Sequence, residues 1–232
     1  MNDITANIAQ IHARINRACQ SSGRNPKNIK LIAVSKIKPA EDIEEAFHAG
    51  QKFFGESYVQ EFRDKQPLVA APVEWHFIGG LQSNKVKYLR GKVTTIHSVD
   101  RLSLAEEIDR QWGKIAGTVD ILLQVNVGDE SSKSGCEPAH LESLVRATAK
   151  LPNLNILGLM CLPPHSDNPE QVRPFFRQLK ELSEQVKQLQ IPGVKMDQLS
   201  MGMSGDFEVA VEEGATLVRV GTAIFGARMK KV

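Results

Sequence analysis

The chain begins with apolar residues that recur every three or four positions, at Ile4, Ile8, Ile11 and Ile15. This spacing puts them on one face of a helix and predicts a helix over residues 3–21. Asn25-Pro26 then interrupts the helical pattern. From that point short apolar runs alternate with stretches of helical periodicity as far as the carboxyl terminus.

Eight apolar runs are predicted strands, at residues 29–35, 53–55, 74–78, 94–99, 120–127, 155–162, 198–201 and 216–220. Predicted helices follow them, at residues 39–49, 58–66, 83–89, 101–115, 137–149, 169–189, 205–213 and 222–230. Alternating strands and helices indicate an α/β protein with a parallel sheet. Eight such units favour a single (β/α)8 TIM barrel with an extra N-terminal helix. An open doubly wound sheet is the alternative, disfavoured because no G-x-G-x-x-G follows the first strand.

We expect one domain over residues 1–232, because no linker, repeat or low-complexity segment is evident. The net charge of +2 gives no reason to expect nucleic acid or an anionic membrane as a partner. No apolar run reaches the ~20 residues of a membrane span, and the N-terminus does not resemble a signal peptide. Three dispersed cysteines favour the cytoplasm, and the six histidines lack metal-binding spacing. No apolar surface patch is evident, so we expect a monomer.

Lys36 follows the apolar run Leu31-Ile32-Ala33-Val34-Ser35. The carboxyl ends of parallel barrel strands form the active face. An amine held there in a partly dry pocket has a lowered pKa and can attack an aldehyde. A surface lysine or a point charge for phosphate would fit the same position. Another strand-end residue on this face is Met160.

The segment from Val218 to Gly226 carries a second set of polar groups. Gly221 allows close approach of a ligand to the backbone, and Thr222 opens the last predicted helix, where an anion would meet free N–H groups. A turn glycine followed by a threonine cap is the alternative. Arg219 needs an acceptor if it is buried, such as a cofactor or the carboxylate of Glu56.

Two serines precede this segment. Ser200 lies at the end of the seventh predicted strand, where a phosphate contact is plausible. Ser204 stands before Gly205-Asp206-Phe207-Glu208, and we expect it to cap the next helix.

Several motifs occur in order along nearly the whole chain: Ala33-Val34-Ser35-Lys36, residues 54–61, residues 75–85, Lys133-Ser134-Gly135, Gly158-Leu159-Met160, residues 199–204 and residues 218–226. Together they resemble the pyridoxal phosphate homeostasis protein family. The resemblance implies a protein that binds pyridoxal 5′-phosphate (PLP) on a fold-type III, alanine racemase-type barrel.

By motif, Lys36 corresponds to the lysine that forms a Schiff base with PLP, and Arg219 to the residue that faces the pyridine nitrogen. Three residues correspond to phosphate contacts: Ser200, Gly221 and Thr222. Further contacts are expected from Ser57, Met160 and Ser204. The family commonly has Asn in place of Ser57 and Pro in place of Gly80, so these two positions depart from its pattern. Lys133 could be a second acceptor for PLP or a solvated loop residue.

Three functions fit these residues. The first is intracellular PLP homeostasis without efficient turnover, with apo-PLP enzymes as recipients. The second is an amino-acid racemase, and the third is a sugar-phosphate aldolase that uses Lys36 as a Schiff base. Racemization needs an acid or base on each face of the substrate Cα. In racemases of this fold the second group, a tyrosine, resembles a contribution from an added C-terminal domain. The chain ends at Val232 and its only tyrosines are Tyr58 and Tyr88, so the first function is expected.

Overall fold

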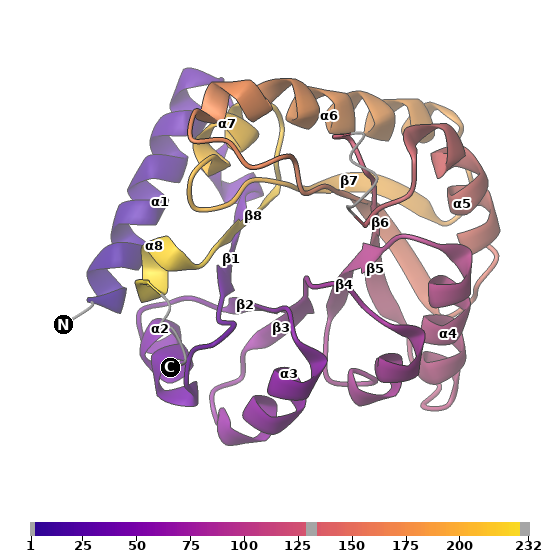
Figure 1. Ribbon diagram of the computed structural model, residues 1–232, viewed down its shortest axis with the longest axis horizontal. Coiled ribbons are helices and arrows are strands. Elements are labelled where there is room, and N and C mark those ends of the chain that lie inside the picture. The colour runs from indigo at the N-terminus through magenta and orange to yellow at the C-terminus, as the bar shows by residue number, and fades with distance from the viewer. Residues whose placement is uncertain (1–2, 129–133, 228–232) are drawn as a thin grey trace.

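The computed structural model describes residues 3–128 and 134–227. Its strands form a closed parallel barrel in chain order, viewed down the opening in Figure 1. The strands are β1 (Lys30–Val34), β2 (Phe53–Glu56), β3 (Glu74–Phe77), β4 (Thr95–Val99), β5 (Val119–Gln124), β6 (Leu154–Met160), β7 (Val194–Ser200) and β8 (Leu217–Val220). Pairing of β1 with β8, with Ala33 opposite Val220, closes the ring. The predicted (β/α)8 barrel is therefore confirmed.

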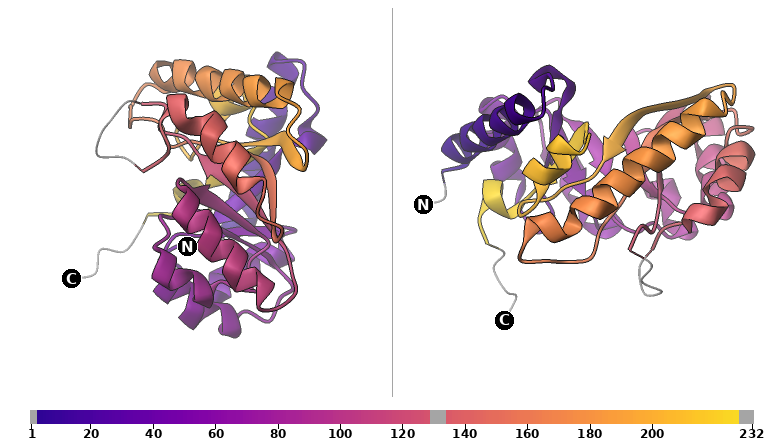
Figure 2. Two further views of the ribbon diagram at one scale, coloured as in Figure 1. Left: turned by 90° about the vertical axis from the view of Figure 1, so that its right-hand side faces the viewer. Right: turned by 90° about the horizontal axis from the view of Figure 1, so that it is seen from above.

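Helices surround the sheet, and α6 lies along the outside of β6 and β7 (Figure 2). The α-helices are α1 (Ile4–Ser21), α2 (Ala40–His48), α3 (Val59–Lys65), α4 (Leu102–Gly113), α5 (Leu141–Thr148), α6 (Arg173–Gln188), α7 (Phe207–Glu212) and α8 (Thr222–Phe225). The 3₁₀ turns are η1 (Pro26–Asn28), η2 (Gln66–Leu68), η3 (Ser83–Tyr88), η4 (Pro138–His140) and η5 (Pro169–Val172).

The extra N-terminal helix α1 packs beside α7 and α8, as Figure 1 shows. Its isoleucine face is buried, and Asn7 Nδ2 donates to the carbonyl of Ile224 at 2.8 Å. Arg14 forms an ion pair with Glu208 at 2.7 Å and lies over the Phe207 ring. Because α8 has only four residues, α1 supplies the apolar cover that a full-length last helix would give.

Side chains on the strands alternate between the helices and the barrel interior, as the pleat of a strand requires. One core cluster lies between the sheet and the helices. A second, smaller cluster fills the inside of the barrel, with Ile32, Leu122, Met160 and Leu217. This inner layer is a packed floor, so ligand space is left only at the carboxyl ends of the strands.

Three predicted elements need correction. Strand β7 begins at Val194, four residues earlier than expected, because exposed Lys195 and Asp197 hide the apolar alternation of its first half. Residues 83–88 form a 3₁₀ helix rather than an α-helix. The last helix ends at Phe225, where Gly226 takes a φ of 74°, and the end of the predicted stretch lies outside the described residues. Among the residues described, no helix has the length and apolarity to cross a bilayer.

Candidate functional site

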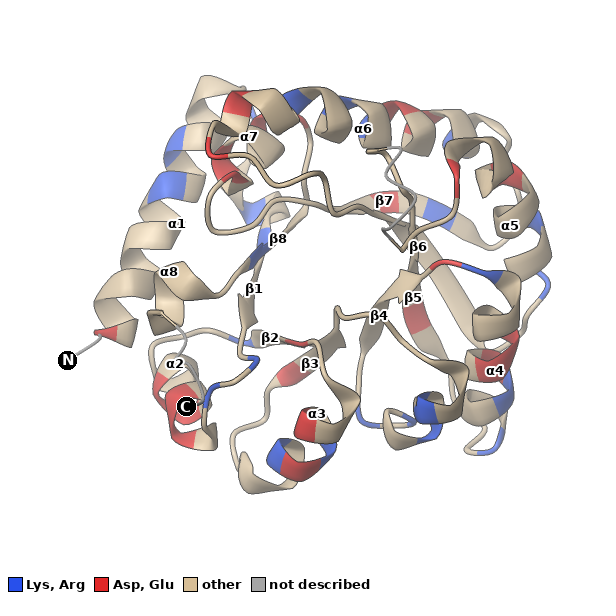
Figure 3. Ribbon diagram, viewed as in Figure 1, with Lys and Arg blue, Asp and Glu red and all other residues tan. Residues whose placement is uncertain are grey.

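A pocket of about 780 Å³ opens at the carboxyl ends of the strands. Its walls come from the ends of β1, β2, β3, β5, β6, β7 and β8 and from the loops that follow them. This volume is within the range of about 300–1,000 Å³ typical of small-molecule sites. In Figure 3, basic residues mark β8 and the segment between β1 and α2 next to this opening.

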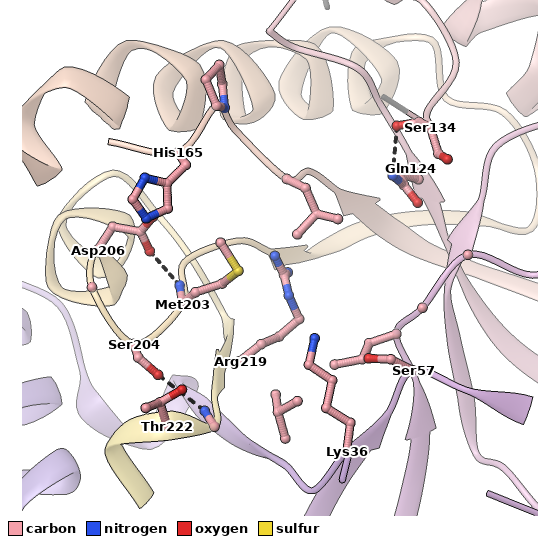
Figure 4. A pocket seen from close by; sticks show the side chains of 18 of the residues that line it. Lys36, Ser57, Gln124, Ser134, His165, Met203, Ser204, Asp206, Arg219 and Thr222 are labelled. Carbon is pink, nitrogen blue, oxygen red and sulfur yellow. Dashed lines mark hydrogen bonds between the residues drawn. The ribbon is translucent and has the colours of Figure 1, made fainter. Parts of the chain in front are cut away.

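Lys36 lies in a turn two residues beyond the end of β1, half-buried, and lines the pocket. Figure 4 shows its side chain extending into the pocket with the amine directed toward Arg219. The predicted position of Lys36 on the active face is thus confirmed. The turn itself is closed by the Lys38 amide, which donates to the carbonyl of Ser35 at 3.1 Å.

Arg219 reaches the floor of the pocket from the interior side of β8 and is only 3% exposed. Its Nη1 donates to Ser200 Oγ at 2.5 Å and its Nη2 to the carbonyl of Cys161 at 2.9 Å. Burial lowers the pKa of Arg219 from its usual value, while the nearby Cys161 and Asp206 oppose the shift. A guanidinium keeps its proton in proteins, so the pocket floor carries a positive charge.

The sequence-based pairing of Arg219 with Glu56 is wrong. Glu56 points out of the barrel toward α3, where its Oε1 accepts hydrogen bonds from Lys65 Nζ and Ser35 Oγ, both at 2.8 Å. Desolvation raises the pKa of Glu56 and the Lys65 charge opposes the rise. Alternate positions along a strand face opposite sides of the sheet. Glu56 faces the helices from β2, whereas Arg219 faces the barrel interior from β8, so the two side chains lie on opposite sides of the sheet.

Ser200 and Met160 lie beneath the pocket rather than in its wall. Both are fully buried and neither lines the pocket. Met160 belongs to the apolar floor inside the barrel, whereas the Ser200 hydroxyl lies beneath Arg219 and supports its guanidinium. The structure therefore gives neither residue a place in the pocket wall, and their expected cofactor contacts stay predictions.

Two buried histidines continue the chain of polar groups below Ser200. His97 Nδ1 lies 2.9 Å from Ser200 Oγ, and His97 Nε2 lies 2.8 Å from His76 Nδ1. Burial lowers the pKa of His76 to about 3 and that of His97 well below its usual value. Both rings are therefore neutral at pH 7. His76 is a buried histidine with a hydrogen-bond partner, as expected for a histidine among apolar residues. The sequence did not indicate that His97 would link His76 to Ser200.

At the other side of the pocket, Ser204, Gly221 and Thr222 form a group of neutral hydrogen-bonding residues. Ser204 Oγ accepts from the Gly221 amide at 3.3 Å, and all three residues line the pocket. A Cβ atom at position 221 would lie 3.1 Å from the Val34 carbonyl oxygen and 3.2 Å from Val34 Cβ, so any larger residue would require Val34 to shift. With α8 only four residues long, hydroxyl and amide donors matter more than a helix dipole.

Ser204 is not the cap of the following helix, contrary to the sequence-based expectation. Helix α7 begins at Phe207 and its N-terminal flanking residue is Asp206. Asp206 Oδ1 instead accepts from the Met203 amide at 2.5 Å. The loop thereby directs Ser204 toward the Gly221 amide, and Figure 4 shows its side chain near Thr222.

The remaining predicted residues divide between the pocket wall and the undescribed segment. Ser57 and Gly80 line the pocket, whereas Lys133 lies outside the described residues. The sequence gave no sign that Gln124, His165 and Asp206 complete the wall. Within residues 3–128 and 134–227, no cluster of His, Cys, Asp and Glu suits a metal ion.

Comparisons with known proteins agree with this geometry. The family model for the N-terminal domain of alanine racemase matches residues 6–229. A pyridoxal phosphate homeostasis protein from Aquifex aeolicus is 49% identical over 222 residues, which cover 95% of this chain and 96% of the relative.

Two solved structures share the fold. PipY of Synechococcus elongatus, described with PLP bound, has a TM-score of 0.85 and 36% identity, covering 97% of this chain and 100% of that protein. An alanine racemase from Clostridium difficile has a TM-score of 0.76 at 13% identity. This chain matches 56% of the racemase, and the match covers 97% of this chain. At that identity only the fold is shared.

Proposed function

Because the chain belongs to the pyridoxal phosphate homeostasis protein family, we propose that its pocket binds PLP and that the protein serves intracellular PLP homeostasis. The observation that carries this proposal is the meeting of three kinds of group in one pocket: the amine of Lys36, the guanidinium of Arg219 and the donors around Gly221. In this proposal the amine meets the aldehyde of PLP, the guanidinium meets its pyridine nitrogen and the donors around Gly221 meet its phosphate.

Lys36 is the proposed attachment residue. When bound, PLP supplies an aldehyde, which condenses with a primary amine to form a C=N bond and release water. Lys36 enters the pocket from a turn between Ser35 and Lys38, and its half-buried amine has access to a ligand inside the pocket.

Ser204, Gly221 and Thr222 are proposed to hold the phosphate. The two hydroxyls can donate to phosphate oxygens, and the Gly221 amide orients the Ser204 hydroxyl by donating to its oxygen. Hydrogen bonds to a charged group contribute about 1.5–3 kcal/mol each. Ser200 acts in this proposal as a support for Arg219 rather than as a phosphate contact.

Arg219 is proposed to face the pyridine nitrogen. As a permanent donor it places positive charge beside the ring and favours an unprotonated nitrogen. Enzymes that withdraw electrons through the ring use a carboxylate partner there. An arginine in that place therefore favours binding without efficient turnover, and apo-PLP enzymes are the proposed recipients of the bound cofactor.

The proposal also covers the domain organisation, the oligomeric state and the cellular location of the protein. Residues 1–232 are proposed to act as a single domain and as a monomer in the cytoplasm. The described cysteines Cys19, Cys136 and Cys161 are free thiols, and burial raises the pKa of Cys136 and Cys161 to about 12. Neither thiol therefore competes with Lys36 for an aldehyde at pH 7.

The absorbance spectrum of the protein incubated with PLP and freed of excess ligand tests this proposal. A visible band that borohydride abolishes, with one equivalent of cofactor retained, is expected. A protein that retains no cofactor after desalting, or retains it without a reducible band, would contradict the proposed covalent binding.

A further inference from the structure

The residue after Lys36 has a rare backbone conformation. Ile37 has a φ of +62°, although its branched side chain makes this region unfavourable. Its side chain is also 44% exposed, so packing does not account for the conformation. Backbone strain of this kind persists only where the surroundings fix it, and it is concentrated at functional sites.

A polar network, buried at Glu56, Lys65 and Ser35 and partly exposed at Glu61, contacts the backbone on both sides of Lys36. The Ile37 amide donates to Glu61 Oε1 at 2.6 Å. Lys65 Nζ donates to that same oxygen at 2.5 Å, and to the Ser35 carbonyl and Glu56 Oε1, each at 2.8 Å. The Ser35 hydroxyl completes the network by donating to Glu56 Oε1 at 2.8 Å.

Burying these charged groups costs desolvation free energy, so the network is not explained by a gain in stability. The Glu56 side chain is inaccessible and that of Lys65 is 9% exposed. Glu56 Oε2 is buried without a hydrogen-bond partner among the described residues. Buried ion pairs often add little net stability because of desolvation, and an unsatisfied buried oxygen adds a further penalty.

We propose that Glu61, with Lys65 and Glu56, positions Lys36 for covalent attachment of its ligand. The network holds Ser35 and Ile37, so the backbone of the turn is fixed on both sides of Lys36. The backbone that carries the amine is then already ordered, so no conformational entropy of the turn is lost when the amine reacts. This inference rests on the proposed function, in which the Lys36 nitrogen forms a C=N bond with an aldehyde and the aldehyde oxygen leaves as water.

The test compares two ligands and three variants. PLP measures the rate of covalent attachment to Lys36. Pyridoxine 5′-phosphate lacks the aldehyde and therefore measures noncovalent binding in the pocket alone. Glu61→Ala removes the acceptor for Ile37, and Glu61→Gln keeps an oxygen there. Glu44→Ala is the matched control, because Glu44 is also half-buried and its Oε1 accepts from the amides of Ala70 and Ala71 at 2.6 and 3.0 Å, away from the pocket.

A misplacement near 1 Å can cost a reaction about a hundredfold. We therefore expect Glu61→Ala to slow borohydride-stable labelling of Lys36 by at least about tenfold, with unchanged affinity for pyridoxine 5′-phosphate. Glu61→Gln should restore most of the rate, and Glu44→Ala should leave it unchanged. If Glu61→Ala does not fold, Glu61→Met, which keeps the length of the side chain but removes the acceptor for the Ile37 amide, takes its place with the same expected slowing.

Labelling of Lys36 at the wild-type rate in the Glu61→Ala or substitute variant would overturn the inference. An equal loss for both ligands would also overturn it, because the network would then support the pocket as a whole. Failure of the proposed function has a different signature, since wild-type protein itself would then carry no label on Lys36.

Discussion

Arg219 donates through Nη1 to the hydroxyl of Ser200 at 2.5 Å, inside the barrel. Because that oxygen accepts from a guanidinium, the Ser200 proton is free to point at His97 Nδ1, 2.9 Å away. His97 then carries its proton on Nε2 and donates to His76. Ser200, His97 and His76 thus form a row of neutral hydrogen-bonded groups, and Ser200 at its end accepts from the buried guanidinium of Arg219.

Ser200→Ala tests this support. Losing a hydrogen bond to a charged group should lower the free energy of unfolding by about 1.5–3 kcal/mol, measured by urea denaturation. If Ser200 holds Arg219 rather than phosphate, PLP and pyridoxal should lose affinity by the same factor. A loss confined to PLP would restore Ser200 as a phosphate contact.

Thr222→Val and Ser204→Ala test the proposed phosphate site. Each removes a hydroxyl from the group around Gly221, and a loss of about 1.5–3 kcal/mol corresponds to a roughly tenfold to hundredfold weaker affinity for PLP. Pyridoxal, which lacks the phosphate, should bind almost unchanged. Titration of both ligands by fluorescence or absorbance measures the difference, and equal losses would place the phosphate elsewhere.

The buried histidines predict a loss of stability in acid. Burial lowers the pKa of His76 to about 3 and lowers that of His97 strongly, so below pH ~6.5 the unfolded chain binds more protons than the folded one. Each histidine should then reduce the free energy of unfolding by about 1.4 kcal/mol per pH unit. The loss begins near pH 6.5 and continues down toward the folded-state pKa.

Glu56 and Asp206 oppose this trend, because burial raises their pKa. The measurement therefore compares wild type with His97→Asn in urea at pH 7, 6 and 5. The pH slope of the variant should be shallower by about 1.4 kcal/mol per unit. Equal slopes for wild type and His97→Asn would contradict a neutral His97.

The protein loaded with PLP should exchange the Cα hydrogen of L-alanine slowly or not at all. The proposed placement of Arg219 beside the ring disfavours electron withdrawal through the ring, because enzymes that rely on it use a carboxylate there. Incubation in deuterated water, followed by NMR and by an assay for D-alanine, measures both outcomes. Rapid exchange over many turnovers would favour the racemase alternative.

The barrel could be predicted from the sequence because buried parallel strands are short apolar runs with clear boundaries. The same rule placed Lys36 and Gly221 at the carboxyl ends of the strands, since Lys36 comes two residues after β1 and Gly221 directly after β8. Strand β7 was the exception, because its first half is partly exposed and reads as polar.

The pairing of site residues was less predictable, because it depends on which side of a strand each residue faces. Leu217 and Arg219 share the inner face of β8, whereas Phe54 and Glu56 share the outer face of β2. Neither orientation is evident from apolar runs that are buried on both faces. Ser204 was assigned as a cap for a related reason, since the loop that turns it into the pocket depends on Asp206.

Peptide mapping tests the central claim most directly. Wild-type protein is incubated with PLP, reduced with borohydride, digested and analysed by mass spectrometry. We expect one reduced pyridoxyl group per chain, carried by the peptide that contains Lys36. A label found mainly on another lysine, such as Lys38 or Lys65, or spread over several surface lysines, would contradict the assignment of this pocket as the covalent PLP site.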